Sequence, residues 1–313
     1  MLHDLYLPLL LPVLVVPLVR WLSGRLHPIW SSWLITVSAS VLAAATVVTL
    51  FLLAFAGLLT VPRVDRMGHW SGAAVRATDA SHLPLNIAAG PVLAVLAVAT
   101  IGAIAARIRA LIEAAQIAKL GGPRERQLVV VPDGRPMAHA VPGRPGRIVV
   151  STRMLDLLDP VERRALLAHE RAHLVQRHHL FVATVEVAAA ANPLLRPLVP
   201  VIRYTTERWA DEISAGRVGD RSVVARAIGK AALATREVAS APGFALAVAT
   251  GPVPRRVAAL LTTPPAARLV KVLCSPVGLC AVAALLLTAV SGWSAVDAVA
   301  DLRRVLEITE ISR

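Results

Sequence analysis

The chain has 313 residues, of which 56% are hydrophobic and only 4% aromatic, and its formal net charge at pH 7 is +13. This composition is too apolar for an ordinary soluble domain and favours a membrane protein whose basic residues lie near anionic lipid. The arginines are dispersed and are not interleaved with aromatic residues, so direct nucleic-acid binding is not expected.

Three apolar runs near the N-terminus predict membrane helices at about 5–22, 33–61 and 83–106. Each is long enough to cross a bilayer, whose hydrocarbon core is roughly 30 Å thick. The first run contains prolines, which a membrane helix tolerates when its neighbours satisfy the freed backbone groups. A signal peptide is the alternative for this run, but His3 and Asp4 stand where such a peptide needs basic residues.

A fourth apolar run, from about Val272 to Val290, predicts one more membrane helix. Orientation follows from the basic residues beside the short connections, which are Arg20, Arg25, Arg107, Arg109, Arg268 and Lys271. They place the segment between the third and fourth helices in the cytoplasm and both termini outside. The predicted organisation is three membrane helices in 1–106, a cytoplasmic domain in 107–270, and a fourth membrane helix with a short outer tail in 271–313.

The predicted cytoplasmic domain begins with a helical pattern over 107–120. Three short β-rich runs follow, at 127–131, 137–141 and 147–152, separated by turn residues such as Asp133-Gly134. They predict a small antiparallel sheet. The expected fold class is therefore a mainly α integral membrane protein with an α+β domain.

A helix start is recognisable at Asp159-Pro160-Val161-Glu162, with Asp159 as N-cap, Pro160 at the first helical position and Glu162 at the third. The helix that follows carries the HExxH motif, formed by His169, Glu170 and His173. Histidines four apart on a helix point the same way and can supply two ligands of a tetrahedral zinc site.

A third ligand is predicted from Glu207, which lies 34 residues after His173 in an ExxxD motif with Asp211. An open fourth position allows zinc to activate water, and Glu170 can take the proton. Asp211 is expected to accept a hydrogen bond from a ligand histidine, with Glu212 as the competing acidic residue. A structural zinc would need a fourth protein ligand, usually cysteine, and residues 107–270 contain no cysteine.

Other polar residues near the motif are not expected to bind the metal. His178 and His179 are interpreted as a polar stretch of the helix, and His139 as a strand residue. Arg203 and Tyr204 are candidates for stabilising an oxyanion. The apolar segment 180–202 is interpreted as a buried helix with a turn at Asn192-Pro193; a fifth membrane span is the alternative, and would separate His173 from Glu207.

These motifs resemble the membrane-bound gluzincin peptidases of the BlaR/MecR antirepressor class and, more distantly, the HtpX and CAAX prenyl protease group. The resemblance covers roughly residues 107–220 and rests on the segments Ala138–Gly143, Arg147–Ser151, Ala165–His173, Asn192-Pro193 and Glu207–Asp211. It implies a zincin-like metalloprotease fold with one Zn²⁺ held by His169, His173 and Glu207, and Glu170 as the catalytic acid/base.

The resemblance also implies a multi-pass protein of the bacterial cell membrane that cleaves a winged-helix transcriptional repressor. Two features depart from the family pattern. Only about residues 291–313 follow the last predicted helix, too few for an extracellular sensor domain, and His178 stands where related sequences often have aspartate. Quality-control proteolysis and a non-catalytic scaffold that keeps its metal site are the alternatives; the oligomeric state is not predicted.

Overall fold

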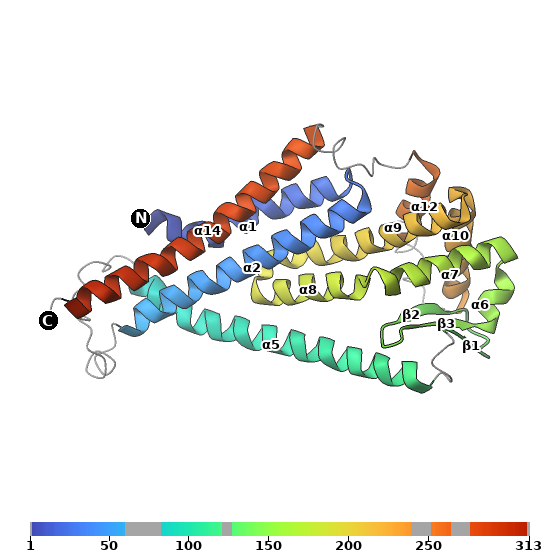
Figure 1. The fold of residues 1–313 in the computed structure, drawn as a ribbon, viewed down its shortest axis with the longest axis horizontal. Helices are drawn as coiled ribbons and strands as arrows, with labels where there is room; N and C mark the ends of the chain where they lie inside the picture. The colour runs from blue at the N-terminus through green and yellow to red at the C-terminus, as the bar shows by residue number, and fades with distance from the viewer. Residues whose placement is uncertain (1, 60–82, 121–126, 239–251, 264–275, 312–313) are drawn as a thin grey trace.

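The computed structural model describes residues 2–59, 83–120, 127–238, 252–263 and 276–311, and it is mostly helical (Figure 1). In chain order the elements are α1 (Leu2–Ser23), α2 (Pro28–Leu59), α5 (Leu83–Leu120), β1 (Leu128–Val131), β2 (Ala138–Val141), β3 (Arg147–Ser151), α6 (Thr152–Leu157), α7 (Pro160–Val175), α8 (His178–Ala191), the 3₁₀ helix η2 (Pro193–Leu198), α9 (Val199–Val218), α10 (Arg221–Val238), α12 (Pro252–Leu261) and α14 (Pro276–Ile311).

The first three predicted membrane helices are confirmed as helices long and apolar enough to span a bilayer. Their apolar stretches are Tyr6–Ser23 in α1, Pro28–Leu58 in α2 and Pro84–Gln116 in α5. The helix predicted over 107–120 is not separate, because α5 runs without a break to Leu120. At the other end of α5, Gly57 of α2 allows a close approach: a Cβ at this position would lie 2.7 Å from the Asn86 carbonyl oxygen.

The fourth predicted span falls on α14, whose apolar part, Leu279–Ser294, is shorter than the three spans above. Residues 272–275 of the prediction lie outside the described residues, so the fourth crossing stays a prediction. The helix packs along α1 and α2, and the Thr288 hydroxyl donates to the Ser38 hydroxyl at 3.4 Å. Helical structure continues to Ile311, where the sequence predicted a short tail.

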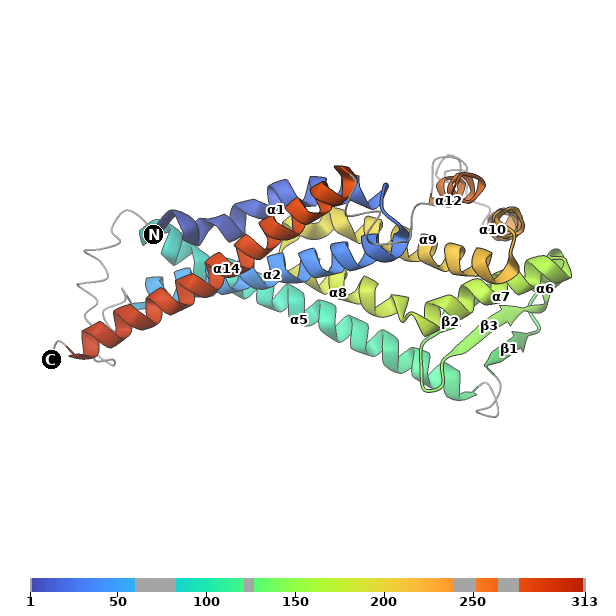
Figure 2. The ribbon, with the colours of Figure 1, turned by 45° about the horizontal axis from the view of Figure 1, so that its top comes forward.

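The segment 180–202 forms a helix and a turn, as predicted, and not a fifth span. Helix α8 runs between α2 and α5, the chain turns at Asn192, and α9 leads it back, as Figures 1 and 2 show. Leu195 and Ile202 are fully buried in one apolar core with α1 and α2. The amide Nδ2 of Asn192 donates to Thr46 Oγ1 of α2 at 2.9 Å. This hairpin returns α9 to the end of the molecule from which α8 started.

The sheet has three strands in the order β1-β3-β2, and the predicted antiparallel arrangement is wrong for β1. Strands β2 and β3 form an antiparallel hairpin, but β1 pairs with β3 in parallel, with Leu128 opposite Ile148. The turn after β1, where Asp133 Oδ1 accepts from the Arg135 amide at 2.9 Å, leads the chain across to the far edge of β3. Strand β2 is therefore an edge strand, and this edge lies beside α7.

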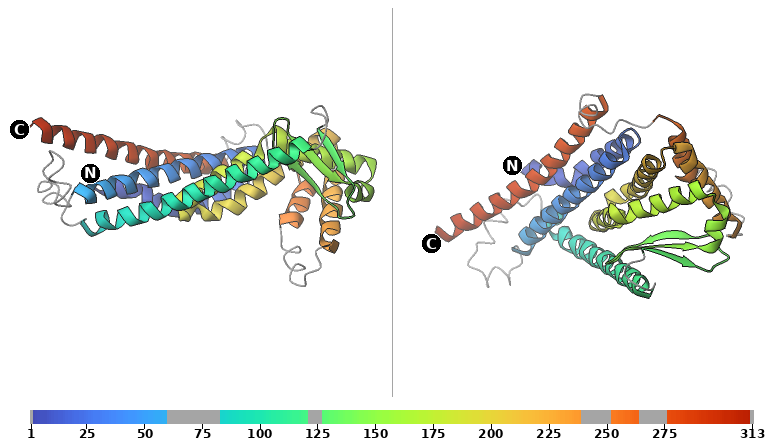
Figure 3. Two further views of the ribbon diagram at one scale, coloured as in Figure 1. Left: turned by 90° about the horizontal axis from the view of Figure 1, so that it is seen from below. Right: turned by 45° about the vertical axis from the view of Figure 1, so that its right-hand side comes forward.

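A second apolar core joins the sheet to the helices of the same end of the molecule. Val150 of β3, Met154 of α6, Ala165 of α7 and Val224 of α10 are all buried in it. Both chain termini lie toward the opposite end of the molecule (Figure 3). The motif helix α7 is thus held between a small sheet, α10 and the returning helix α9.

Candidate metal centre

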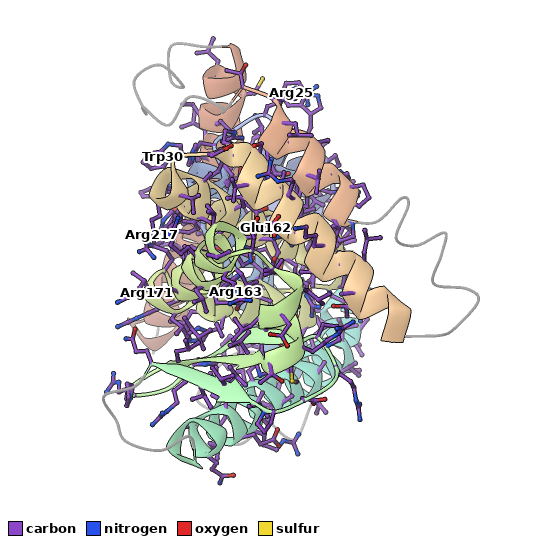
Figure 4. The ribbon with its side chains drawn as sticks, turned by 90° about the vertical axis from the view of Figure 1, so that its right-hand side faces the viewer. Arg25, Trp30, Glu162, Arg163, Arg171 and Arg217 are labelled. Carbon is purple, nitrogen blue, oxygen red and sulfur yellow. The ribbon has the colours of Figure 1, made fainter. Side chains whose placement is uncertain are left out.

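Helix α7 begins where the sequence predicted. Asp159 Oδ1 accepts from the amides of Val161 and Glu162, both at 2.8 Å, and Glu162 Oε2 accepts from the Asp159 amide at 3.0 Å. Glu162, labelled in Figure 4, is 1% exposed and also accepts from Lys230 Nζ of α10 at 2.6 Å. This capping box fixes where the helix starts and so which face carries the histidines.

Helix α9 lies against α7 and presents the ExxxD motif to it. The Ser214 hydroxyl donates to the Ala165 carbonyl oxygen at 2.7 Å, and both residues are buried. Glu207 and Asp211, one turn apart, therefore lie on the same face of α9 as Ser214, toward the histidines. Glu212 does not compete with Asp211, because its carboxylate pairs with Arg208 and Arg221.

The three predicted ligands lie together and form a possible metal site. His169 Nε2 is 3.1 Å from His173 Nε2, and each of these nitrogens is 3.5 Å from an oxygen of Glu207. Ligand atoms about 2.0–2.1 Å from a tetrahedral zinc ion would be separated by about 3.3 Å. The spacing and the N, N, O donor set therefore fit zinc with one position left for water.

The carboxylate of Asp211 is completely buried behind the first histidine. Its Oδ1 lies 3.0 Å from His169 Nδ1, although the N–H is not well aligned with it. The contact fixes which ring nitrogen of His169 carries the proton and leaves Nε2 for the metal. Asp211 thus lies next to His169, where the predicted contact with a ligand histidine requires it.

Arg256 of α12 was not anticipated from the sequence. Its Nε and one terminal nitrogen donate to the two Asp211 oxygens at 2.8 and 2.7 Å, and its other terminal nitrogen is 2.8 Å from Glu207 Oε2. One guanidinium thus orients both acidic residues of the ExxxD motif. The positions of residues 207, 211 and 256 in the sequence follow no motif that would have predicted this contact. The sequence offered only the general expectation that a buried acidic residue such as Asp211 has a charged partner.

His178 is the second residue whose place differs from the expectation. It is 2% exposed, its Nδ1 is 3.1 Å from His173 Nδ1, and its ring packs on Trp209. Burial lowers the pKa of His178 to about 3, so the ring is neutral. When His173 uses Nε2 for a metal, its Nδ1–H can donate to His178 Nδ1. The signal in the sequence was its spacing of five residues from His173.

Glu170 lies beside the ligands in a buried position. Desolvation raises its pKa, partly opposed by the charge of His169 and by a hydrogen bond from the backbone of Ala140 on β2. A carboxylate with a raised pKa is a better proton acceptor near neutral pH than an ordinary glutamate. Its position between the metal site and the edge strand is where a general base is needed.

In the metal-free protein, the surroundings shift the pKa values of the three ligand residues in different directions. Burial disfavours the charged form of His169, but contacts with Asp211 and Glu207 raise its pKa to about 10. Burial lowers the pKa of His173 to about 4. Burial acts to raise the pKa of Glu207, but His169 and Arg256 outweigh it and lower that pKa. A protonated His169 therefore occupies the position in which a metal would bring its positive charge.

The site opens into a cavity of about 620 Å³ between β2, α7, α8 and α9. His139 and Arg203 line it, but His139 is not among the grouped ligand atoms, and Arg203 pairs with Glu186, which also binds Arg107 of α5. Tyr204 is not among the lining residues; its ring lies under the guanidinium of Arg255 at 4.6 Å. Of the two oxyanion candidates, only Arg203 reaches the cavity.

One comparison with known proteins gives a match to part of the chain. The sequence profile of peptidase family M48 matches residues 102–192, which contain His169, Glu170 and His173 and end before Glu207. Peptidases of this family are zinc-dependent, so the match supports a zinc metallopeptidase, in agreement with the donor set of the site. Searches of curated proteins and of solved structures found no match.

Proposed function

We propose that this chain is a membrane-embedded zinc endopeptidase whose active site faces the cytoplasm. The proposal rests on one observation: two histidines of α7 and a glutamate of α9, far apart in sequence, present their donor atoms within 4.8 Å of one another. Four membrane helices with both termini outside, as the arginine distribution predicts, would put this site at the inner face of the bilayer.

The proposed roles follow from the contacts. His169, His173 and Glu207 would hold zinc, which supplies Lewis-acid activation of the peptide carbonyl and of water. Glu170 would take the proton of the attacking water and pass it to the leaving amine. Asp211 and His178 hold the two imidazoles in the tautomers that leave Nε2 available.

The decisive experiment compares Glu170→Gln and Glu207→Ala with the wild type. Glu170→Gln should keep one zinc per chain and lose proteolysis, because the base is gone and the ligands remain. Glu207→Ala should lose both zinc and proteolysis. Metal content by mass spectrometry and casein cleavage in detergent report the two quantities. Unchanged cleavage in Glu170→Gln would exclude this mechanism, and zinc binding with no cleavage in the wild type would favour the non-catalytic scaffold.

We further propose a regulatory role, cleavage of a winged-helix repressor, from the resemblance described above. Quality control of damaged membrane proteins is the second candidate, favoured by the α8–α9 hairpin, which sets the site among apolar helices. A neighbouring gene for a small winged-helix repressor, cleaved by the purified protease, would support the first role. Accumulation of misfolded membrane proteins in a Glu170→Gln strain, with no cleaved repressor, would support the second.

A further inference from the structure

The metal cavity continues into a second one of about 870 Å³. The two cavities share Pro142, Leu174 and His179 among their lining residues, so they form one groove. The second cavity is bounded by α5, by the turn between β2 and β3, and by the junction of α7 with α8. A polypeptide bound at the metal site can therefore extend into it.

This second cavity, which we call the basic pocket, is lined by Arg144, Arg147, Arg177 and His179, and no acidic residue lines it among the described part of the chain. The side chains of Arg144 and Arg177 are exposed and have no ion pair with any described residue. The arginines of the metal cavity, Arg107 and Arg203, by contrast both form ion pairs with Glu186. The basic pocket thus presents unneutralised positive charge to whatever fills the groove.

The backbone at the basic pocket is held in an unusual conformation. Arg177 has a φ of +53°, the left-handed region that non-glycine residues seldom adopt and that costs roughly 1–2 kcal/mol. It separates α7 from α8, so that His178 turns back to His173 while Arg177 and His179 line the basic pocket. Strained residues of this kind are concentrated at functional sites.

The edge strand β2 gives the direction in which a substrate would lie. The Met137 carbonyl oxygen accepts a hydrogen bond from the Ser151 amide of β3. Because backbone groups alternate between the two sides of a strand, those of Ala138 and Ala140 point to the free edge. There the Ala140 amide donates a hydrogen bond to Glu170. An extended substrate can add to this edge as a further strand. If it runs antiparallel to β2, its residues N-terminal to the scissile bond pass the end of β2 and reach the basic pocket.

We propose that the protease prefers substrates with an acidic side chain about two to four residues N-terminal to the scissile bond, and that Arg144 and Arg177 bind its carboxylate. The substrate would lie along β2, so the spacing in the substrate equals the number of residues between Ala140, which lies beside Glu170, and the turn that carries Arg144. This inference rests on the proposed function and specifies which substrates the same site takes.

The test uses the full-length zinc-loaded protein in detergent and fluorogenic peptides with Glu, Gln or Lys at each of four positions on either side of the cleaved bond. The wild type should cleave the Glu peptides about 5- to 10-fold better than the Gln peptides, measured as kcat/KM, at one or two positions on the N-terminal side only. Equal rates for Glu, Gln and Lys at all positions would overturn the proposal.

Variants of the two arginines identify the residues responsible. The double variant Arg144→Gln with Arg177→Gly should bring the ratio of kcat/KM for Glu and Gln peptides toward one. Glycine at residue 177 suits the positive φ, so the fold is retained. Arg144→Glu with Arg177→Glu should shift the preference to Lys peptides. The matched control is Arg171→Gln: Arg171, labelled in Figure 4, is an exposed arginine of α7 that lines neither cavity, and the variant should keep the wild-type ratio.

Two further measurements separate this proposal from its alternatives. Binding of the same peptides to Glu170→Gln, by fluorescence anisotropy, shows the acidic preference even if no peptide is cleaved, so failure of the proteolytic function is distinguishable from failure of the basic pocket. Nanodiscs with and without phosphatidylglycerol test an anionic lipid headgroup as the occupant. If the arginine variants abolish a response to this lipid but leave peptide selectivity intact, the proposal is overturned.

Discussion

Arg256→Met is the substitution whose outcome follows most directly from the structure. Asp211 is 0% exposed, and both of its carboxylate oxygens receive hydrogen bonds from Arg256. Removing one partner of a buried ion pair leaves an uncompensated charge and typically costs about 3–5 kcal/mol. We expect the free energy of unfolding of the metal-free variant to fall by that amount, because in this state only protonated His169 remains beside the two carboxylates of Asp211 and Glu207.

The adjacent arginine is a matched control. Arg255 is exposed and lies over the Tyr204 ring at 4.6 Å, a contact worth about 0.5–1 kcal/mol at such a site. Arg255→Met should therefore cost several-fold less than Arg256→Met, although both remove the same side chain from α12. The pair Asp211→Asn with Arg256→Met should be more stable than the sum of the single effects predicts, because it removes both charges together.

The assay is unfolding by denaturant in detergent after metals have been removed with a chelator. Circular dichroism and the rate of proteolysis of the unfolded protein both monitor the transition. Equal destabilisation by Arg255→Met and Arg256→Met would refute the reasoning, since it would mean that burial of Asp211 does not set the cost. Strict additivity in the Asp211 and Arg256 pair would refute it as well, because two groups that bond directly must be coupled.

Three other outcomes are expected. His178→Ala should lower zinc affinity about 10- to 100-fold by removing the acceptor for His173, with His178→Asn less affected, as measured by chelator competition. Protonated His169, with its pKa raised to about 10 from 6.5, stabilises the metal-free fold fully below about pH 6.5, and this contribution is lost as the pH rises toward 10. Zinc must displace that proton, so zinc affinity should keep rising roughly tenfold per pH unit above pH 7, and a plateau there would contradict the assignment. Asn192→Ala should cost about 1–3 kcal/mol of unfolding free energy, because the buried Thr46 hydroxyl oxygen loses its donor and the Leu194 amide loses its acceptor, and an unchanged denaturation midpoint would be evidence against this.

Features that depend on near neighbours in the chain were predictable from the sequence. The start of α7 at Asp159 and the helical spacing of His169 and His173 need only residues within a few turns of one another. The three long apolar helices follow from composition over a window of about 20 residues. The turn at Asn192-Pro193 was recognisable for the same reason, because proline and asparagine act on their own backbone.

Only the tertiary structure decided the partners of the buried polar groups. Nothing in the local sequence says that β1 pairs with β3 in parallel, that Arg256 rather than Arg255 reaches Asp211, or that His178 turns back onto His173. Each depends on the packing of segments that are distant in sequence or, for His178, on a single left-handed residue that redirects the chain. The sequence by itself determined which residue types carry the chemistry; the packing of α7, α9 and α12 determined which of them meet, because a buried charge takes its partner from whatever element folds against it.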